Sequence, residues 1–146
     1  MIIDYNLRFN NPGSGKQMRQ FGDPGTGQVV TASAAGDVVI DQQAEGDAVA
    51  IGAALAFRCV ASKAGEGECT IRIALQTCDT NTPSSVWKTL LETGEFAGKD
   101  INAGEVLADF RVPQGCKRFL RAYYTVSTES GKTCKATVNS FLTKEF

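Results

Sequence analysis

The side chains best suited to chemistry in this sequence are five cysteines: Cys59, Cys69, Cys78, Cys116 and Cys134. No two of them form a C-x-x-C pair, which excludes a zinc knuckle and a thioredoxin-like motif. The chain has no histidine to activate a thiol, so Cys116, beside Lys117 and Arg118, is the only candidate nucleophile. Cys69 and Cys134 lie in strand-like segments, where a free cysteine acts as a small apolar residue. We therefore expect free, structural thiols in a chain folded in a reducing cytosol.

Two glycine-rich stretches, Gly13–Lys16 and Gly25–Gly27, look like pieces of a phosphate-binding loop. The complete motif requires G-x-x-x-x-G-K-[ST] between a strand and a helix, and neither flank is present here. Asp37 and Asp41 bracket a strand-like run on one face, whereas a glycosidase needs two carboxylates opposed across a cleft. The sequence also lacks a D-x-D-x-D-G calcium loop. We expect no catalytic residue, no metal site and no cofactor.

The composition describes an ordinary globular chain. Its 146 residues suit one domain, and 42% of them are hydrophobic and 21% charged. Fifteen Lys and Arg residues against sixteen Asp and Glu give a formal charge of -1, so there is no basic excess with which to bind nucleic acid. No apolar run approaches the ~20 residues of a membrane-spanning helix, and Met1–Arg8 lacks the pattern of a signal peptide. We expect neither nucleic acid nor a membrane as partner.

Residues 1–27 differ in character from the rest of the chain. Pro12 and Pro24, with glycines around them, rule out a regular helix or a long strand in this segment. The segment keeps isolated apolar and aromatic side chains that could act as anchors: Tyr5, Leu7, Phe9 and Phe21. We expect an extended N-terminal arm over residues 1–27 that lies through these anchors on its own body or on a neighbour.

From residue 28 to residue 146 the apolar residues recur with a period of two. In Arg118–Val126, for example, Leu120 and Tyr124 fall on one face of a strand while Arg121 and Tyr123 fall on the other. About seven to nine such runs are bounded by Gly, Pro, Asn or Asp, which is typical of an antiparallel sandwich or barrel. No segment sustains the helical period for three turns. The sequence predicts a single all-β domain, an antiparallel β-sandwich, over residues 28–146.

One strand combines positive charge with aromatic rings, through Arg118, Arg121 and Tyr123. An oligosaccharide or a single-stranded nucleic acid can use such a face. With a net charge near zero, a surface that faces a partner or only solvent is the better interpretation. We interpret Trp87 as a residue of the core or of a subunit interface rather than as a sugar platform.

The order of short motifs resembles that of a known family, the small capsid cement or decoration proteins of tailed bacteriophages, and the Bordetella-phage type in particular. The matching segments are Met1–Asp4, Leu7–Phe9, Gln28–Ser33, Val39–Asp41, Gly46–Gly52, Ile101–Gly104, Pro113 and Arg118–Val126. The resemblance runs over nearly the whole chain in order, although each piece is short. The chain departs from the family pattern in its longer Gly-Pro segment, Asn10–Gly27, and in its cysteines.

This resemblance implies a jelly-roll-like β-sandwich on the outer surface of the capsid in the virion, made in the cytoplasm of the host bacterium. Such proteins form symmetric homo-oligomers, here a dimer or a trimer, and tie neighbouring major capsid subunits together without catalysis. The arm anchors and the basic strand would then contact the major capsid protein or a second copy of this chain. Two alternatives remain from the residues: a carbohydrate- or receptor-binding module of a phage tail or fibre, and a cupin-type enzyme, which would need the metal-binding histidines that this chain lacks.

Overall fold

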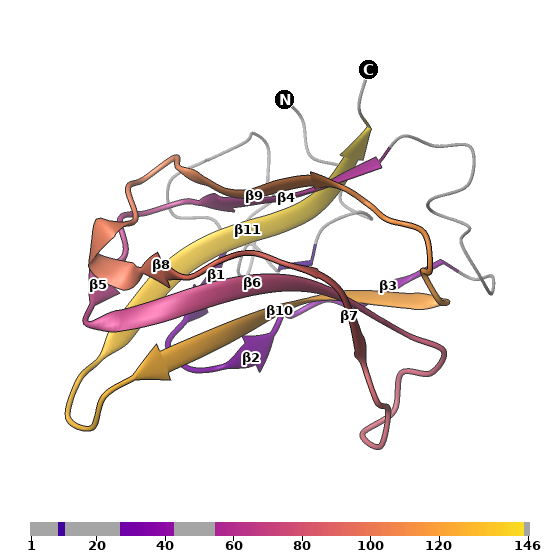
Figure 1. Cartoon of the computed structure of the whole chain (residues 1–146), viewed down its shortest axis with the longest axis horizontal. Coiled ribbons are helices and arrows are strands. Elements are labelled where there is room, and N and C mark those ends of the chain that lie inside the picture. The colour runs from indigo at the N-terminus through magenta and orange to yellow at the C-terminus, as the bar shows by residue number, and fades with distance from the viewer. Residues whose placement is uncertain (1–8, 11–26, 43–54, 145–146) are drawn as a thin grey trace, which may run out of the picture.

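The computed structural model describes residues 9–10, 27–42 and 55–144, which form two antiparallel sheets packed face to face (Figure 1). The first sheet has the order β1 (Gln28–Val30), β11 (Cys134–Lys144), β4 (Leu55–Ala61) and β9 (Val106–Arg111), and β5 (Glu66–Gly67) also pairs with β11. The second has the order β2 (Ala34–Ala35), β10 (Phe119–Thr128), β6 (Cys69–Cys78) and β7 (Lys88–Glu92). Two further short strands join it: β3 (Ile40–Asp41) pairs with β10, and β8 (Phe96–Ala97) pairs with β6.

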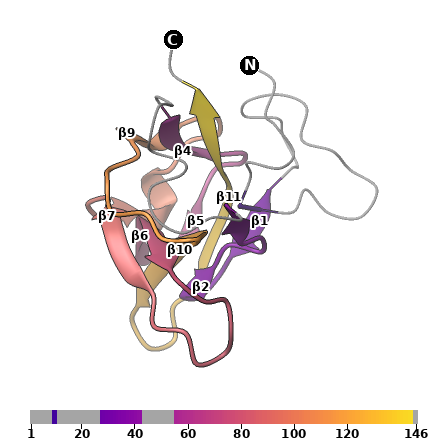
Figure 2. The same ribbon diagram turned by 90° about the vertical axis from the view of Figure 1, so that its right-hand side faces the viewer.

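The connectivity is that of a jelly roll. Without the short strands β3, β5 and β8, the chain runs from β1 to β2, crosses to β4, returns to β6 and β7, and then visits β9, β10 and β11. Figure 2, which looks along the strands, shows β4 and β9 above β6 and β10. This arrangement of two interleaved Greek keys confirms the expected all-β, jelly-roll-like sandwich. Among the described residues the helical part is one 3-10 turn, Gly98–Asp100.

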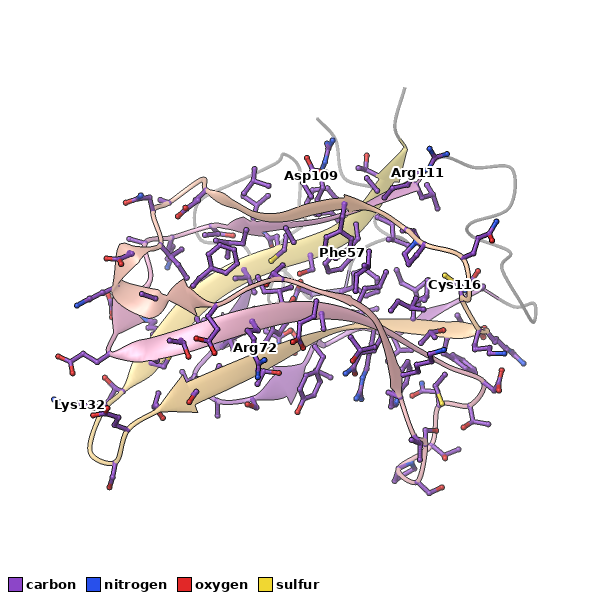
Figure 3. All side chains as sticks on the ribbon, viewed as in Figure 1. Phe57, Arg72, Asp109, Arg111, Cys116 and Lys132 are labelled. Atoms are coloured by element: carbon purple, nitrogen blue, oxygen red, sulfur yellow. A yellow bond between two sulfur atoms is a disulfide. The ribbon has the colours of Figure 1, made fainter. Side chains whose placement is uncertain are left out.

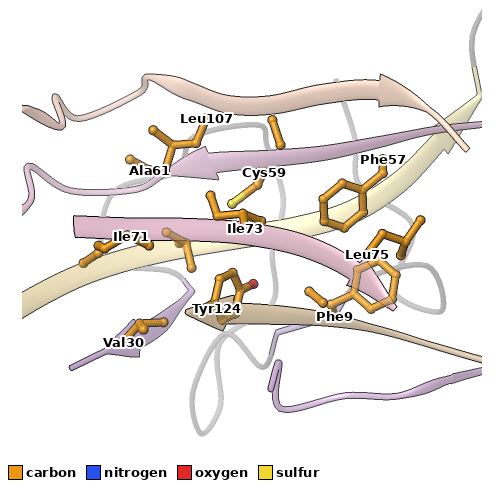
Figure 4. Packing of buried hydrophobic residues seen from close by; sticks show 14 of the residues in the cluster. Phe9, Val30, Phe57, Cys59, Ala61, Ile71, Ile73, Leu75, Leu107 and Tyr124 are labelled. Atoms are coloured by element: carbon orange, nitrogen blue, oxygen red, sulfur yellow. The ribbon is translucent and has the colours of Figure 1, made fainter. Parts of the chain in front are cut away.

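Alternation along the two longest paired strands builds the core. β6 and β10 pair in register along their ten-residue lengths, so each strand presents every second side chain to the first sheet. Ile73 of β6 and Leu120 and Tyr124 of β10 are all 0% exposed, as the periodicity predicts. Side chains from β4, chiefly Phe57, meet them from the opposite sheet (Figure 4).

Phe9 closes the edge of the sandwich where β1 and β2 lie. Its N–H donates to the carbonyl oxygen of Ser140 in β11 at 2.8 Å, and its own carbonyl accepts from the N–H of Val38, after β2, at 2.9 Å. Its ring is 0% exposed and lies with its centroid 5.6 Å from that of Phe57. A Cβ on Gly36 would come within 2.6 Å of the Phe9 carbonyl oxygen, so this close approach requires glycine there. Phe9 therefore links both sheets.

That position decides between two alternatives. The sequence left open whether Phe9 anchors the arm on its own body or on a neighbour, and named it as a partner contact, but its ring is fully buried in the protein's own core. A side chain with no exposed surface has none to offer a partner without opening the fold. Residues 9 and 10 thus pack with the sandwich, although the domain boundary expected from the sequence lies at residue 28.

Beside Phe9, a buried polar network ties the same edge together. The Asn10 Oδ1 atom accepts from the Ser140 N–H at 2.6 Å and from the Tyr124 hydroxyl at 3.2 Å. The Tyr124 and Ser140 hydroxyl oxygens lie 2.6 Å apart, and Asn10 Nδ2 donates to Gln28 Oε1 at 2.7 Å. Burial raises the pKa of Tyr124 above its ordinary range, so its hydroxyl stays protonated and able to donate.

Replacing Tyr124 with phenylalanine is expected to lower the free energy of unfolding by about 1–3 kcal/mol, because polar atoms of Asn10 and Ser140 lose a partner inside the protein. Urea unfolding of wild type and variant measures the difference. Tyr123→Phe is the matched control, since that neighbouring hydroxyl is on the partly exposed face, and its expected effect is within about 0.5 kcal/mol. Equal stability of all three proteins would show that the network contributes nothing.

The two sheets are also joined covalently. Cys69 at the start of β6 and Cys134 at the start of β11 form a disulfide, with 2.06 Å between the sulfur atoms. The expectation of five free thiols is therefore wrong for this pair and agrees with the structure for Cys59, Cys78 and Cys116. The two cysteines are 65 residues apart in sequence, and the pairings of Gly67 with Cys134 and of Cys69 with Thr128 bring them to the same end of the sandwich.

Candidate functional site

The outer face of the second sheet carries a cluster of one cation and two aromatic rings, formed by Trp87, Arg121 and Tyr123. Arg121 and Tyr123 alternate along β10 with the buried residues and so point away from the core. Trp87 comes immediately before β7, at the edge of the same sheet. The guanidinium carbon of Arg121 lies 4.4 Å from the centroid of the Trp87 ring and 5.1 Å from that of Tyr123. Both distances fit cation–π contacts. We call these three residues the Arg121 cluster.

Neighbouring strands fix the orientation of the guanidinium. Arg121 stands opposite Gln76, which stands opposite Thr89 on β7. Arg121 Nε donates to Gln76 Oε1 at 2.8 Å, and Gln76 Nε2 donates to Thr89 Oγ1 at 3.3 Å. A guanidinium carries about five N–H donors in a planar fork. Among the described residues, Gln76 is the hydrogen-bond acceptor of Arg121 and no carboxylate pairs with it.

Partial burial of Arg121 disfavours its charged form. Partial burial lowers the pKa of the guanidinium, while Tyr123 and Cys78 act in the opposite direction. Arginine nevertheless stays protonated at any physiological pH. At the border of the cluster, a hydrogen bond from the backbone of Thr80 is the main cause that lowers the pKa of the Cys78 thiol. The cluster thus holds a partly desolvated, oriented cation.

The other arginines of this face are already neutralised. Arg118 donates through Nε and Nη2 to the two carboxylate oxygens of Asp41, at 2.8 and 3.0 Å. Arg72 lies 3.4 Å from a carboxylate oxygen of Glu92. Figure 3 shows Arg72 on the second sheet, and Asp109 and Arg111 on the first. Of the arginines Arg72, Arg118 and Arg121, it is Arg121 that has no carboxylate within ion-pair distance in the described part of the chain.

Of the predicted basic and aromatic strand residues, the structure brings Arg121 and Tyr123 together and places Arg118 in its own ion pair. Sequence reasoning placed Trp87 in the core or at a subunit interface; its partial exposure against Arg121 excludes the core and leaves the interface as a prediction. The pairing of β6 with β7 brings Trp87 and Arg121 together, and no pattern in the sequence indicates that register. The predicted arm anchors Tyr5, Leu7 and Phe21 lie outside the described residues, as does Gly13–Lys16.

Other chemistry finds little support in the described part of the chain. Its His, Cys, Asp and Glu residues nowhere gather in a group of three or more that could hold a metal ion. Cys116, the candidate nucleophile, is 1% exposed, with its sulfur 3.5 Å from the Pro113 carbonyl oxygen. Burial raises the pKa of the Cys59 thiol to about 12, which keeps it unreactive. The helical content over residues 9–10, 27–42 and 55–144 includes no segment long and apolar enough to span a bilayer.

No curated protein is similar to the chain at a significant level. A family model described as Bbp16, the name of a Bordetella phage protein, matches residues 25–139. The match begins just before β1 and ends inside β11, so it includes the strands from β1 to β10 and the first part of β11. This extent shows that the chain belongs to the Bbp16 family.

Proposed function

We propose that this protein is a capsid decoration protein, which binds the outer surface of an assembled phage head and ties neighbouring major capsid subunits together. The observation that carries the proposal is the Bbp16 match from residue 25 to residue 139, which covers most of the jelly roll. A family named for a phage protein supports a structural role in a virion. The earlier resemblance to cement proteins points to the same role.

The physical character of the chain is consistent with such a role. Phe9 and the Cys69–Cys134 disulfide both connect the two sheets, which makes the sandwich a stiff body. The Arg121 cluster offers an oriented cation and rings on one outer face. On a repeating lattice, many copies of a modest contact add up through multivalency. We propose that the protein acts as a symmetric dimer or trimer and that Tyr5, Leu7 and Phe21 provide further contacts.

Co-sedimentation tests the function directly. Purified protein is mixed with expanded phage heads that lack it, with unexpanded heads as control. We expect saturable binding at a fixed ratio to the major capsid protein, together with an increase in the temperature at which the heads rupture. The ratio would identify the symmetry axis that is occupied. Absence of binding to both kinds of head would refute the decoration role.

A glycan-binding role is the second candidate, because Trp87 and Tyr123 do share one face. A sugar stacks on an open aromatic ring, but the guanidinium of Arg121 already covers one side of both rings. A glycan array with the purified protein separates the two roles. Specific glycan binding without head binding would favour the receptor-binding module.

A further inference from the structure

We propose that the Arg121 cluster is the energetic centre of the docking surface and that it receives a carboxylate side chain of the partner protein. The inference rests on the proposed function, in which the partner surface is the outer face of the capsid shell. Two observations support it: the absence of a carboxylate beside the Arg121 guanidinium among the described residues, and the way in which its neighbours hold it.

The first observation is the missing counter-charge. Arg118 and Arg72, on the same sheet, each have a carboxylate within 3.4 Å. Arg121 is partly buried, and its partners in the described part of the chain are the neutral Gln76 and the rings of Trp87 and Tyr123. A cation that has lost part of its hydration without gaining a counter-ion is costly to bury. An acidic side chain from a partner would remove that cost and could form the paired N–H···O bonds that a guanidinium makes with a carboxylate.

The second observation is preorganisation. The Nε–H of Arg121 donates to Gln76, which in turn donates to Thr89. The rings of Trp87 and Tyr123 make cation–π contacts with the guanidinium. The remaining donors, on the two terminal nitrogens, are left for a ligand. A group that is already oriented loses less freedom when it binds. Trp, Tyr and Arg are also the residue types that dominate the binding energy of protein interfaces.

The test compares variants in a titration onto the same heads. Arg121→Ala should weaken binding by about 30-fold or more, as for a central interface residue. Arg121→Lys keeps the charge but loses the planar fork, so we expect intermediate binding. Arg111→Ala is the matched control, because Arg111 is an exposed arginine on β9 of the other sheet. Thermal unfolding of each variant checks that the fold is intact. If Arg121→Ala fails to fold, the binding of Arg121→Lys is compared with that of wild type instead.

Treating the heads with a carbodiimide and a neutral amine tests the chemistry of the occupant, because this converts accessible carboxylates to amides. We expect treated heads to bind wild type as weakly as untreated heads bind Arg121→Ala, and treatment to change the binding of Arg121→Ala little. If Arg121→Ala binds the heads as tightly as wild type does, the inference is overturned and the decoration role still stands. Loss of binding in Arg121→Ala with no effect of the amide treatment would overturn the carboxylate occupant. Failure of wild type to bind any head removes the proposed function and this inference with it.

Discussion

Replacing Phe9 with alanine is expected to lower the free energy of unfolding by about 3–5 kcal/mol, the usual cost of removing a buried phenylalanine ring. The ring is 0% exposed and contacts Phe57 in the core. Its removal opens a cavity between β11 of one sheet and the segment after β2 that belongs to the other. Because both sheets lose a shared contact, we expect little relaxation of the cavity. Urea unfolding followed by the fluorescence of Trp87 measures the loss.

The comparison variants define what the ring itself contributes. Phe9→Leu keeps much of the volume and should cost less than Phe9→Ala. Val29→Ala removes an apolar side chain that is 53% exposed in the adjacent strand β1, and its expected effect is within about 0.5 kcal/mol. If Phe9→Ala were no less stable than Val29→Ala, Phe9 could not be part of the core, and its role as a partner contact would regain support.

Alternation explains why the strands themselves could be predicted. Most residues of β6 and β10 that the period assigns to the interior, such as Ile71, Ile73 and Leu120, are buried, while Val126 near the end of β10 is partly buried. The two-residue strands β2, β3, β5 and β8 have no period to read. Phe9 was misassigned for a related reason, because prolines and glycines around it indicate irregular backbone but not where that backbone packs. Its place depends on hydrogen bonds to Ser140 and Val38, which are distant in sequence.

The candidate site was half predictable for the same reason. Arg121 and Tyr123 belong to one strand, so the period of two places them on one face. Trp87 joins them from β7, through the order β10-β6-β7 of the sheet. The ion pairs of Arg118 and Arg72 likewise come from Asp41 on β3 and Glu92 on β7. The pairing of the strands, and not a local sequence motif, therefore decides which of these arginines has a carboxylate beside it in the described part of the chain.

We expect the disulfide to make a large contribution to the free energy of unfolding, and a reductant can remove this contribution without any mutation. It joins Cys69 of the second sheet to Cys134 of the first and closes a loop with a sequence separation of 65. For a loop of that length, the loss of chain entropy in the unfolded state corresponds to about 4 kcal/mol. A Cβ on Gly98 would lie 2.6 Å from the Cys69 sulfur, so glycine at this position leaves room for the bond.

Reduction is therefore expected to lower the free energy of unfolding by about 2–4 kcal/mol, measured by urea unfolding with and without dithiothreitol. The double variant Cys69→Ser and Cys134→Ser should be as unstable as the reduced wild type and indifferent to the reductant, because the remaining cysteines, Cys59, Cys78 and Cys116, are free thiols. Alkylation in denaturant should label these three before reduction and all five afterwards. Five labels without reduction would show that the bond is absent from the protein as isolated. In a reducing compartment glutathione and thioredoxin keep thiols reduced, so the protein would lack this contribution there. Phe9 and the buried network of Asn10 and Tyr124 would then hold the sheets together without the bond.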